Sequence, residues 1–294
     1  MKLIIFSIFL LFPCLSSAEN KSQIFTVKPQ SDSDSTHTFY IDLIKLALKK
    51  INKLDDYSIH PMDKVLSQGR TLIELTKKGG PSIYQSGTSI EREKNLIPIR
   101  IPLLKGTLGY RISLIHKDNI EKFDNISDLK GLSQFTACQG LHWPDSDILE
   151  NAGLSVIRNP SYKNMFLQVK NKRCDYFPRS IIEAYAEADA LNDPDIVVYD
   201  KLIISYPFPM YFFVSPYHKK LGVDIEEGLQ LAIKDGSFDT FFNENKITKY
   251  LFPLTKWKNS TILNIKNPLL PKQTPTNNTA LWMNLKKTSA SKSE

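Results

Sequence analysis

The sequence predicts an α/β fold built as two lobes, each an alternation of strands and helices. Three observations predict it. Extended and helical segments alternate through the first hundred residues, a pattern that implies crossover units and a largely parallel sheet. A second such set begins near Ile126 and covers about a hundred residues, within the usual range for one domain. About 275 residues remain after the predicted leader, enough for two domains.

The N-terminus has the organisation of a secretory signal peptide. A positive start at Lys2 is followed by an apolar run over residues 3–12 and by small residues at positions 16–18. This pattern predicts cleavage after Ala18, so residues 1–18 are a leader and the mature chain is periplasmic. The apolar run is shorter than the ~20 residues that a spanning helix needs, and no later segment is apolar enough to span a membrane.

Cys14 raises the alternative of a lipid-anchored cysteine. A lipoprotein signal places small residues directly before its cysteine, whereas Leu11, Phe12 and Pro13 precede this one. The cleaved signal peptide is therefore the favoured interpretation.

The composition is that of an ordinary globular protein, with 41% hydrophobic and 23% charged residues. The formal net charge of +7 becomes +6 once Lys2 leaves with the leader. The basic residues are dispersed, which argues weakly for an anionic partner and does not support a nucleic-acid partner. The histidines lack ligand spacing and two mature cysteines make no zinc site, so we expect no metal and no cofactor.

The elements of the first lobe follow from local patterns. The clearest is a helix over residues 39–54, where Ile41, Ile44 and Leu48 recur at helical spacing. The predicted elements in chain order are strand 24–28, helix 39–54, strand 57–60, helix 68–78, strand 83–85, and extended segments 96–103 and 109–116.

The second lobe repeats this organisation, and the chain then returns to helix over residues 221–235 and 238–245. The end of the chain is rich in Pro, Asn, Lys and Ser, so residues 281–294 are predicted to be a disordered tail. The predicted elements of the second lobe are strand 135–138, helix 143–151, strand 156–158, helix 162–171, strand 174–177, helix 181–190, and strands 197–198 and 210–214.

The mature chain keeps Cys138 and Cys174, which an exported protein is able to oxidise. Cys138 falls at the end of one predicted strand and Cys174 at the start of another. In parallel neighbours the two sulfurs would then lie at opposite ends of the sheet, whereas a disulfide needs Cα atoms within about 7 Å. Two separate buried thiols are favoured over a bridge.

Four motifs in this order resemble the extracellular solute-binding proteins of family 3, which have the type 2 periplasmic-binding fold. Residues 88–92 resemble the family's T-x-E-R segment, with Ser89 where the family usually has threonine. Residues 126–131, followed by a strand and the Gln139–Gly140 turn, resemble the entry into lobe two. Residues 173–176 and 229–242 resemble the G-x-x-D-A strand and the closing helix.

A closer resemblance is to the transporter substrate-binding domain subgroup. The segments that carry it are residues 39–44, 67–70, 176–179 and 206–214. The resemblance names no ligand.

The resemblance implies two Rossmann-like lobes joined by two crossing hinge strands, near residues 113–117 and 212–216. Lobe one would comprise residues 19–115 plus 216–280, and lobe two residues 116–215. Ligands of such sheets lie beyond the carboxyl ends of the strands, at helix N-termini, which places the site between the lobes. Closure on the ligand would be a hinge motion.

Arg92 is the leading ligand contact. In the resembling family this arginine binds a ligand carboxylate through two hydrogen bonds, because a guanidinium offers two parallel donors. Thr88 and Ser89 are the adjacent donors. The alternative is an ordinary helix N-terminus with surface charges, and the motif context favours binding.

Arg179 is the departure from the family. Amino-acid binders usually place an aspartate in this loop of lobe two, which receives the ammonium of the ligand, and an arginine would repel that group. Two interpretations stay open. Arg179 reflects the ligand, which then carries a second anionic group or lacks an amine, or it pairs with Glu183, four residues on.

Further contacts are predicted in both lobes. The free amides of the turn at Gln139 and Gly140 would bind an anion or a carbonyl, and Trp143 would stack on a flat ligand. Tyr40 and Arg70 would line lobe one. The alternatives are core packing for Trp143 and Tyr40, and a solvated position for Arg70.

The favoured function is a monomeric solute-binding protein that delivers a small polar, anionic or amino-acid-like ligand to an ABC-type importer. The second candidate is a ligand-sensing module for a membrane receptor. A dehydratase-type enzyme ranks third, with Glu183 or Asp145 as its acid. The chain lacks the motifs of hydrolase nucleophiles, zinc proteases and P-loops, which argues against catalysis.

Overall fold

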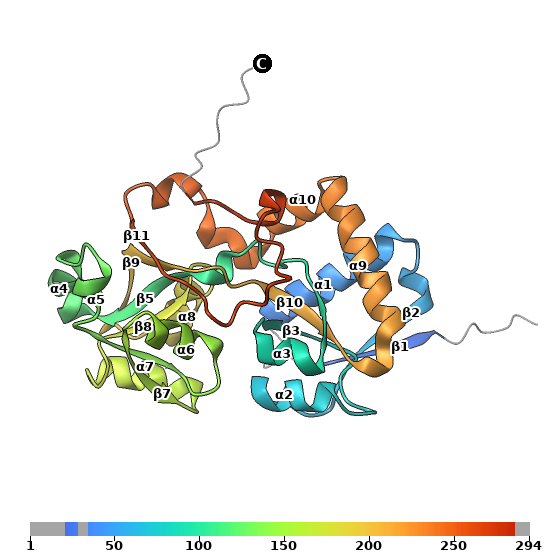
Figure 1. The fold of residues 1–294 in the computed structure, drawn as a ribbon, viewed down its shortest axis with the longest axis horizontal. Helices are drawn as coiled ribbons and strands as arrows, with labels where there is room; N and C mark the ends of the chain where they lie inside the picture. The colour runs from blue at the N-terminus through green and yellow to red at the C-terminus, as the bar shows by residue number, and fades with distance from the viewer. Residues whose placement is uncertain (1–20, 29–34, 286–294) are drawn as a thin grey trace, which may run out of the picture.

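The computed structural model of the chain describes residues 21–28 and 35–285. The predicted leader, residues 1–18, and residues 286–294 of the predicted tail lie outside this range. The described chain forms two lobes that lie side by side along the long axis of the molecule (Figure 1).

Strands and helices alternate along most of the chain, as the sequence predicts. The strands are β1 (Ser22–Thr26), β2 (Tyr57–Pro61), β3 (Ile83–Gly87), β4 (Ile97–Ile99), β5 (Tyr110–His116), β6 (Thr136–Gly140), β7 (Ser155–Asn159), β8 (Tyr176–Ser180), β9 (Ile196–Ser205), β10 (Met210–Val214) and β11 (Thr261–Asn264). The α-helices are α1 (Ser35–Lys50), α2 (Gln68–Leu75), α3 (Ile90–Asn95), α4 (Ile120–Asp124), α5 (Leu129–Leu132), α6 (Pro144–Asn151), α7 (Tyr162–Lys170), α8 (Ala184–Leu191), α9 (Lys219–Lys234) and α10 (Ser237–Glu244).

Short 3₁₀ helices join several of these elements. They are η1 (Leu54–Asp56), η2 (Thr107–Gly109), η3 (Lys117–Asn119), η4 (Pro216–His218), η5 (Lys246–Leu251), η6 (Leu254–Trp257) and η7 (Thr279–Leu281). Among residues 21–28 and 35–285, no helix is both long and apolar enough to cross a membrane.

Lobe 1 contains β1–β4, β10 and helices α1–α3, α9 and α10 (Figure 1). β10 lies between β3 and β4 and is antiparallel to both, while β1 pairs with β2 in parallel. The apolar face of α1 is buried against α9, with Leu43 and Ala47 fully enclosed. Gly228 of α9 permits this close packing, because a Cβ there would lie 2.0 Å from the Ala47 carbonyl oxygen.

A buried carboxylate joins α9 to the start of lobe 1. Asp224 accepts hydrogen bonds from Lys53 Nζ and Lys220 Nζ, both at 2.7 Å, and from Tyr57 Oη at 2.6 Å. Burial alone would raise the pKa of Asp224, but these three donors lower it to about 2. The cluster therefore stabilises lobe 1 at pH values where the carboxylate is ionised.

Lobe 2 is a six-stranded mixed sheet in the order β11-β9-β5-β8-β6-β7. β6 runs parallel to β7 and β8, whereas β5 is antiparallel to both of its neighbours. β5, with the sequence Tyr-Arg-Ile-Ser-Leu-Ile-His, is almost wholly buried. The α/β class and the two-lobed organisation predicted from the sequence are confirmed.

The crossings between the lobes lie at other positions than the sequence predicted, as the strand pairing shows. The crossings were expected near residues 113–117 and 212–216. β5 instead pairs wholly within lobe 2 and β10 wholly within lobe 1, so the chain crosses before each of these strands. β11 pairs with β9 although residues 216–280 were expected in lobe 1. The pairing partner of a strand depends on distant segments, which local patterns do not reveal.

The C-terminal segment lies over the crossings and touches both lobes. The Leu269 carbonyl accepts a hydrogen bond from the Ile90 N–H of lobe 1 at 3.0 Å, and the Met283 carbonyl accepts one from the Tyr110 hydroxyl of lobe 2 at 3.1 Å. The prediction of a disordered tail is wrong for residues 281–285, because both leucines in this stretch are buried. The polar composition of the segment predicted disorder, but its few apolar residues are buried in the core and hold it in place.

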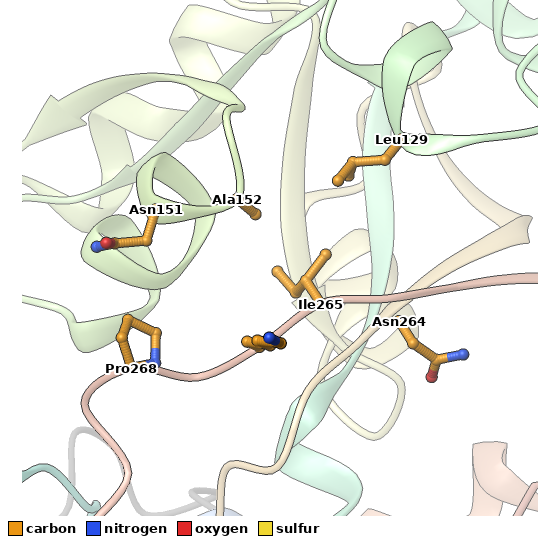
Figure 2. A pocket seen from close by; sticks show the side chains of 7 residues that line it. Leu129, Asn151, Ala152, Asn264, Ile265 and Pro268 are labelled. Carbon is orange, nitrogen blue, oxygen red and sulfur yellow. The ribbon is translucent and has the colours of Figure 1, made fainter.

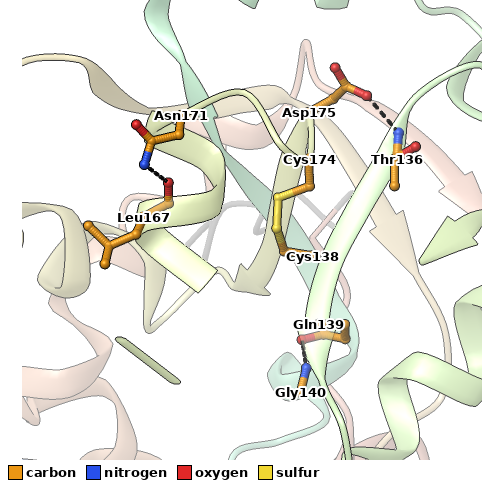
Figure 3. The surroundings of a disulfide bond; sticks show 8 residues. All are labelled: Thr136, Cys138, Gln139, Gly140, Leu167, Asn171, Cys174 and Asp175. Carbon is orange, nitrogen blue, oxygen red and sulfur yellow. Dashed lines mark hydrogen bonds between the residues drawn. A yellow bond between two sulfur atoms is a disulfide. The ribbon is translucent and has the colours of Figure 1, made fainter. Parts of the chain in front are cut away.

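Cys138 and Cys174 form a disulfide, with Cα atoms 5.7 Å apart (Figure 3). The expectation of two separate thiols is wrong. Cys138 lies in the middle of β6 and not at its end, and β8 begins only at Tyr176. The chain bends at residues 173–175, directly before β8, and the Asp175 N–H donates to the Thr136 carbonyl of β6 at 2.8 Å, so Cys174 lies beside the middle of β6.

Candidate ligand-binding site

Arg92 lies on α3, directly after the strand β3 of lobe 1. Ser89 caps this helix, because its Oγ accepts a hydrogen bond from the Arg92 N–H at 3.2 Å. Thr88 is fully buried, and its hydroxyl donates to Glu93 Oε1 at 2.6 Å. The structure therefore places both predicted hydroxyls at the start of α3, but each takes part in the local fold of lobe 1.

The Arg92 guanidinium is held by four acceptors. Nη1 donates to Ser86 Oγ at 2.8 Å and to the Gly87 carbonyl at 2.6 Å. Nη2 donates to Gln68 Oε1 at 2.8 Å and makes a longer contact of 3.5 Å with the His142 carbonyl. The last contact crosses from lobe 1 to lobe 2. Burial lowers the pKa of Arg92 from its usual value.

Gln139 and Gly140 end β6 in lobe 2 and face the start of α6. Gly140 is required here, because a Cβ would lie 2.4 Å from the Trp143 ring. Gln139 is fully buried, and its Oε1 accepts a hydrogen bond from the Gly140 N–H at 3.2 Å. The Gly140 amide is thus satisfied within the turn, and the group that reaches lobe 1 is the His142 carbonyl.

Arg179 is paired within lobe 2. Its Nε and Nη2 donate to the two carboxylate oxygens of Glu187 at 2.7 and 2.6 Å, and Nη2 lies 3.0 Å from Glu183 Oε2. Burial on its own would lower the pKa of Arg179, and the two carboxylates raise it. The structure shows the pairing of Arg179 with Glu183, and Glu187 is a second acidic partner of the same guanidinium.

Trp143 and Phe177 stack, with ring centroids 6.3 Å apart and planes tilted by 23°. Trp143 also faces the Arg179 guanidinium. The indole predicted to stack on a ligand therefore covers a cation of the protein itself.

A second buried ion pair lies beside the crossings. Arg111 of β5 and the Tyr206 hydroxyl both donate to Asp145 Oδ1 at the start of α6. Arg111 Nη1 lies 3.7 Å from Glu183 Oε2. Arg111, Asp145 and Tyr206 are each at most 4% exposed. This network links lobe 2 to the segment that enters lobe 1.

Tyr40 and Arg70 both belong to lobe 1, and within the described chain neither makes a hydrogen bond or ion pair with Arg92. Tyr40 is 3% exposed and packs edge-on against Phe39 and Phe212 in the core of lobe 1. Burial raises the pKa of Tyr40 well above its usual value, and the charge of Glu183 adds to this effect. Arg70 pairs with Glu74, one turn along α2, at 2.6 Å. Its side chain is 58% exposed, so it occupies the solvated position.

Sequence reasoning missed Gln68 and Arg111. Gln68 stands two residues before Arg70, and the first turn of α2 directs it and not Arg70 to Arg92. Arg111 is a charged residue in an otherwise apolar strand, and that local exception was the available signal. Asp145 was considered only as a catalytic acid.

Two cavities lie outside the set of predicted ligand contacts. One, of about 380 Å³, is bounded by α5, α6 and the segment after β11. Figure 2 shows the side chains of Leu129, Ala152 and Ile265 pointing into it. The other, of about 350 Å³, lies beside the crossings and includes Tyr206 and Trp282. None of the nine predicted ligand contacts lines either cavity.

The fold is shared with solved binding proteins. An ancestral arginine-binding protein bound to arginine is 19% identical over 71% of this chain and 87% of its own, with a TM-score of 0.50. A Salmonella typhimurium periplasmic binding protein with high arginine specificity is 14% identical over 70% and 87%, with a TM-score of 0.51. A histidine kinase sensor domain similar to periplasmic binding proteins is 12% identical over 71% and 85%, with a TM-score of 0.54.

No protein-family model and no curated protein sequence matches the chain. The likeness to the solved structures concerns the fold, because the identities are low. The chain has the two-lobed type 2 periplasmic-binding fold, as the sequence motifs implied.

Proposed function

We propose that the chain is a periplasmic solute-binding protein that holds a small carboxylate-bearing solute between its lobes and delivers it to an inner-membrane importer. The observation that carries this proposal is the position of Arg92. Its guanidinium projects from lobe 1 and contacts the His142 carbonyl of lobe 2, at the start of α6. A carboxylate bound there would touch both lobes.

A ligand carboxylate could replace some of the protein acceptors that now bind the Arg92 guanidinium. Arginine has five N–H donors, and among the described residues the four acceptors of Arg92 engage those of Nη1 and Nη2, which leaves the Nε–H. Opening of the lobes breaks the long His142 contact, and Gln68 is a neutral acceptor that a carboxylate outcompetes. Nε and Nη2 of Arg92 then present two parallel donors to the solute.

The proposed solute carries one carboxylate and needs no second anionic group. That second group was inferred from a free Arg179, whereas Arg179 is neutralised by Glu183 and Glu187. A dianionic ligand is therefore no longer favoured.

A binding role fits the carboxylates better than catalysis does. Asp145 accepts hydrogen bonds from Arg111 and Tyr206, and Glu183 is shared between two arginines. A general acid at neutral pH needs a carboxyl group in an apolar setting without such partners. Neither candidate acid has that setting.

A thermal-shift screen of the mature protein tests the proposal. The compounds are amino acids, dicarboxylates, aromatic acids and small peptides, and the variants are Arg92→Ala and, as a matched control, the exposed Arg173→Ala. A solute at a hundredfold excess over its dissociation constant should stabilise the wild type by about 2.7 kcal/mol. The shift should persist in Arg173→Ala and disappear in Arg92→Ala.

Two results would contradict the proposal in different ways. An equal shift in Arg92→Ala would remove Arg92 from the site. The absence of a shift with every compound would favour the second candidate, a sensory module, which the similarity to a sensor domain supports. A permease gene beside this one would favour transport, and a membrane sensor gene would favour sensing.

A further inference from the structure

Lobe 2 contains an aromatic and acidic cage around one guanidinium. The cage consists of three aromatic and two acidic residues: Trp143, Tyr162, Phe177, Glu183 and Glu187. The guanidinium carbon of Arg179 lies 5.0 Å from the ring centroid of Trp143, 5.1 Å from that of Phe177 and 5.7 Å from that of Tyr162. All three distances are within the ~6 Å range of cation–π attraction.

The acidic side of the cage completes the recognition of a planar cation. Glu187 takes two parallel N–H groups of Arg179, and Glu183 takes a third contact. Bidentate pairing and ring faces are the contacts by which proteins hold a guanidinium that belongs to a ligand. Within the described chain, the cation that fills this cage is a side chain of the protein.

The acceptors of the cage are occupied by arginines of the protein. Both carboxylate oxygens of Glu187 accept N–H groups of Arg179, and Glu183 Oε2 lies 3.0 Å from Arg179 and 3.7 Å from Arg111. A second cation would be repelled by both arginines. The place for a planar cation between the rings and Glu187 is therefore filled by Arg179.

The cage borders the proposed solute site. Trp143 forms one wall of the cage, and the residue before it, His142, provides the carbonyl that contacts Arg92. Tyr162 is 42% exposed, so one wall reaches solvent. A solute held at Arg92 would extend toward this part of lobe 2.

We propose that Arg179 is a specificity-determining residue, a built-in cation that occupies the cation site of lobe 2 and closes it to guanidinium- and ammonium-bearing side chains. This inference rests on the proposed function for its effect on solutes. The solute held at Arg92 then has a neutral side chain, and arginine and lysine are rejected because their binding places are already filled.

Removal of the Arg179 side chain should convert the cage into an open cation site. The probe is methylguanidine, titrated by calorimetry into wild type, Arg179→Ala, Arg179→Met and the exposed control Arg173→Ala. Methionine refills the space with an apolar chain of similar length. We expect Arg179→Ala to bind methylguanidine at least about 10-fold more tightly than the other three proteins, a difference of about 1.4 kcal/mol.

A folding defect does not block the test. If Arg179→Ala alone does not fold, the double variant Arg179→Ala/Glu183→Gln reduces the repulsion between the carboxylates and keeps the bidentate acceptor Glu187, and its titration is compared with that of Arg179→Met. The inference is overturned if the folded variant binds methylguanidine no more tightly than Arg179→Met. It is also overturned if the wild type prefers arginine or lysine to neutral amino acids. Failure of the wild type to bind any solute refutes the proposed function and leaves the methylguanidine titration interpretable.

Discussion

Loss of the Cys138–Cys174 bond should destabilise lobe 2 by several kcal/mol. The cysteines are 36 residues apart in the sequence, so the bond closes a loop of this size in the unfolded chain. The chain-entropy model predicts that a disulfide stabilises the folded state by ~3 kcal/mol for a 15-residue loop and by ~4.7 kcal/mol for a 100-residue loop. For this loop it gives about 4 kcal/mol. With an m-value of about 2 kcal/mol/M, the urea midpoint should fall by about 2 M.

The assay is urea unfolding of oxidised wild type, reduced wild type and the double variant Cys138→Ala/Cys174→Ala, followed by tryptophan fluorescence. Reduced wild type is the matched control, because it keeps both side-chain volumes and loses only the bond. Both cysteines are at most 2% exposed, so we also expect the oxidised native protein to resist reductant until it unfolds. Equal midpoints for the oxidised and reduced wild type would refute the reasoning.

Three further predictions concern other parts of the chain. Asp224→Asn should lower the free energy of unfolding by about 2 kcal/mol near pH 7. The depressed pKa of Asp224 makes this stability present above pH ~4 and lost as the pH falls toward 2. The difference in unfolding free energy between wild type and variant should therefore disappear on acidification. Gly140→Ala should lower the unfolding temperature by several degrees while Gly131→Ala, whose new Cβ meets nothing closer than 3.4 Å, should not, as differential scanning calorimetry will show. N-terminal sequencing of the exported protein should start at Glu19; an intact Met1 would contradict the leader.

The fold was predictable from the sequence because its signals are local. The apolar spacing in α1 and the alternation of short strands with helices need no knowledge of distant residues. The crossings and the place of β11 were not predictable in this way. Each depends on which strand lies beside which, and that choice is set by packing across the whole sheet.

The candidate site was predictable in part, for a related reason. Arg92 was singled out because its motif is contiguous in the sequence, and it makes a contact between the lobes, while its role in binding stays a prediction. Gln68 and Arg111 are brought to the region from separate elements, so no short motif contains them. Arg179 was given two interpretations because Glu183 is one helical turn away, whereas its bidentate partner Glu187 lies eight residues away.

The pairing of β11 with β9 has a consequence for any attempt to isolate one lobe. Neither lobe is a continuous stretch of sequence, because the edge strand of lobe 2 comes from residues 261–264, after the chain has completed most of lobe 1. A fragment cut after β9 would expose the N–H and C=O groups of Ile203 and Ile204 along an open sheet edge. Such an apolar edge is a template for strand addition by another molecule, so the truncated lobe should self-associate more readily than the full chain.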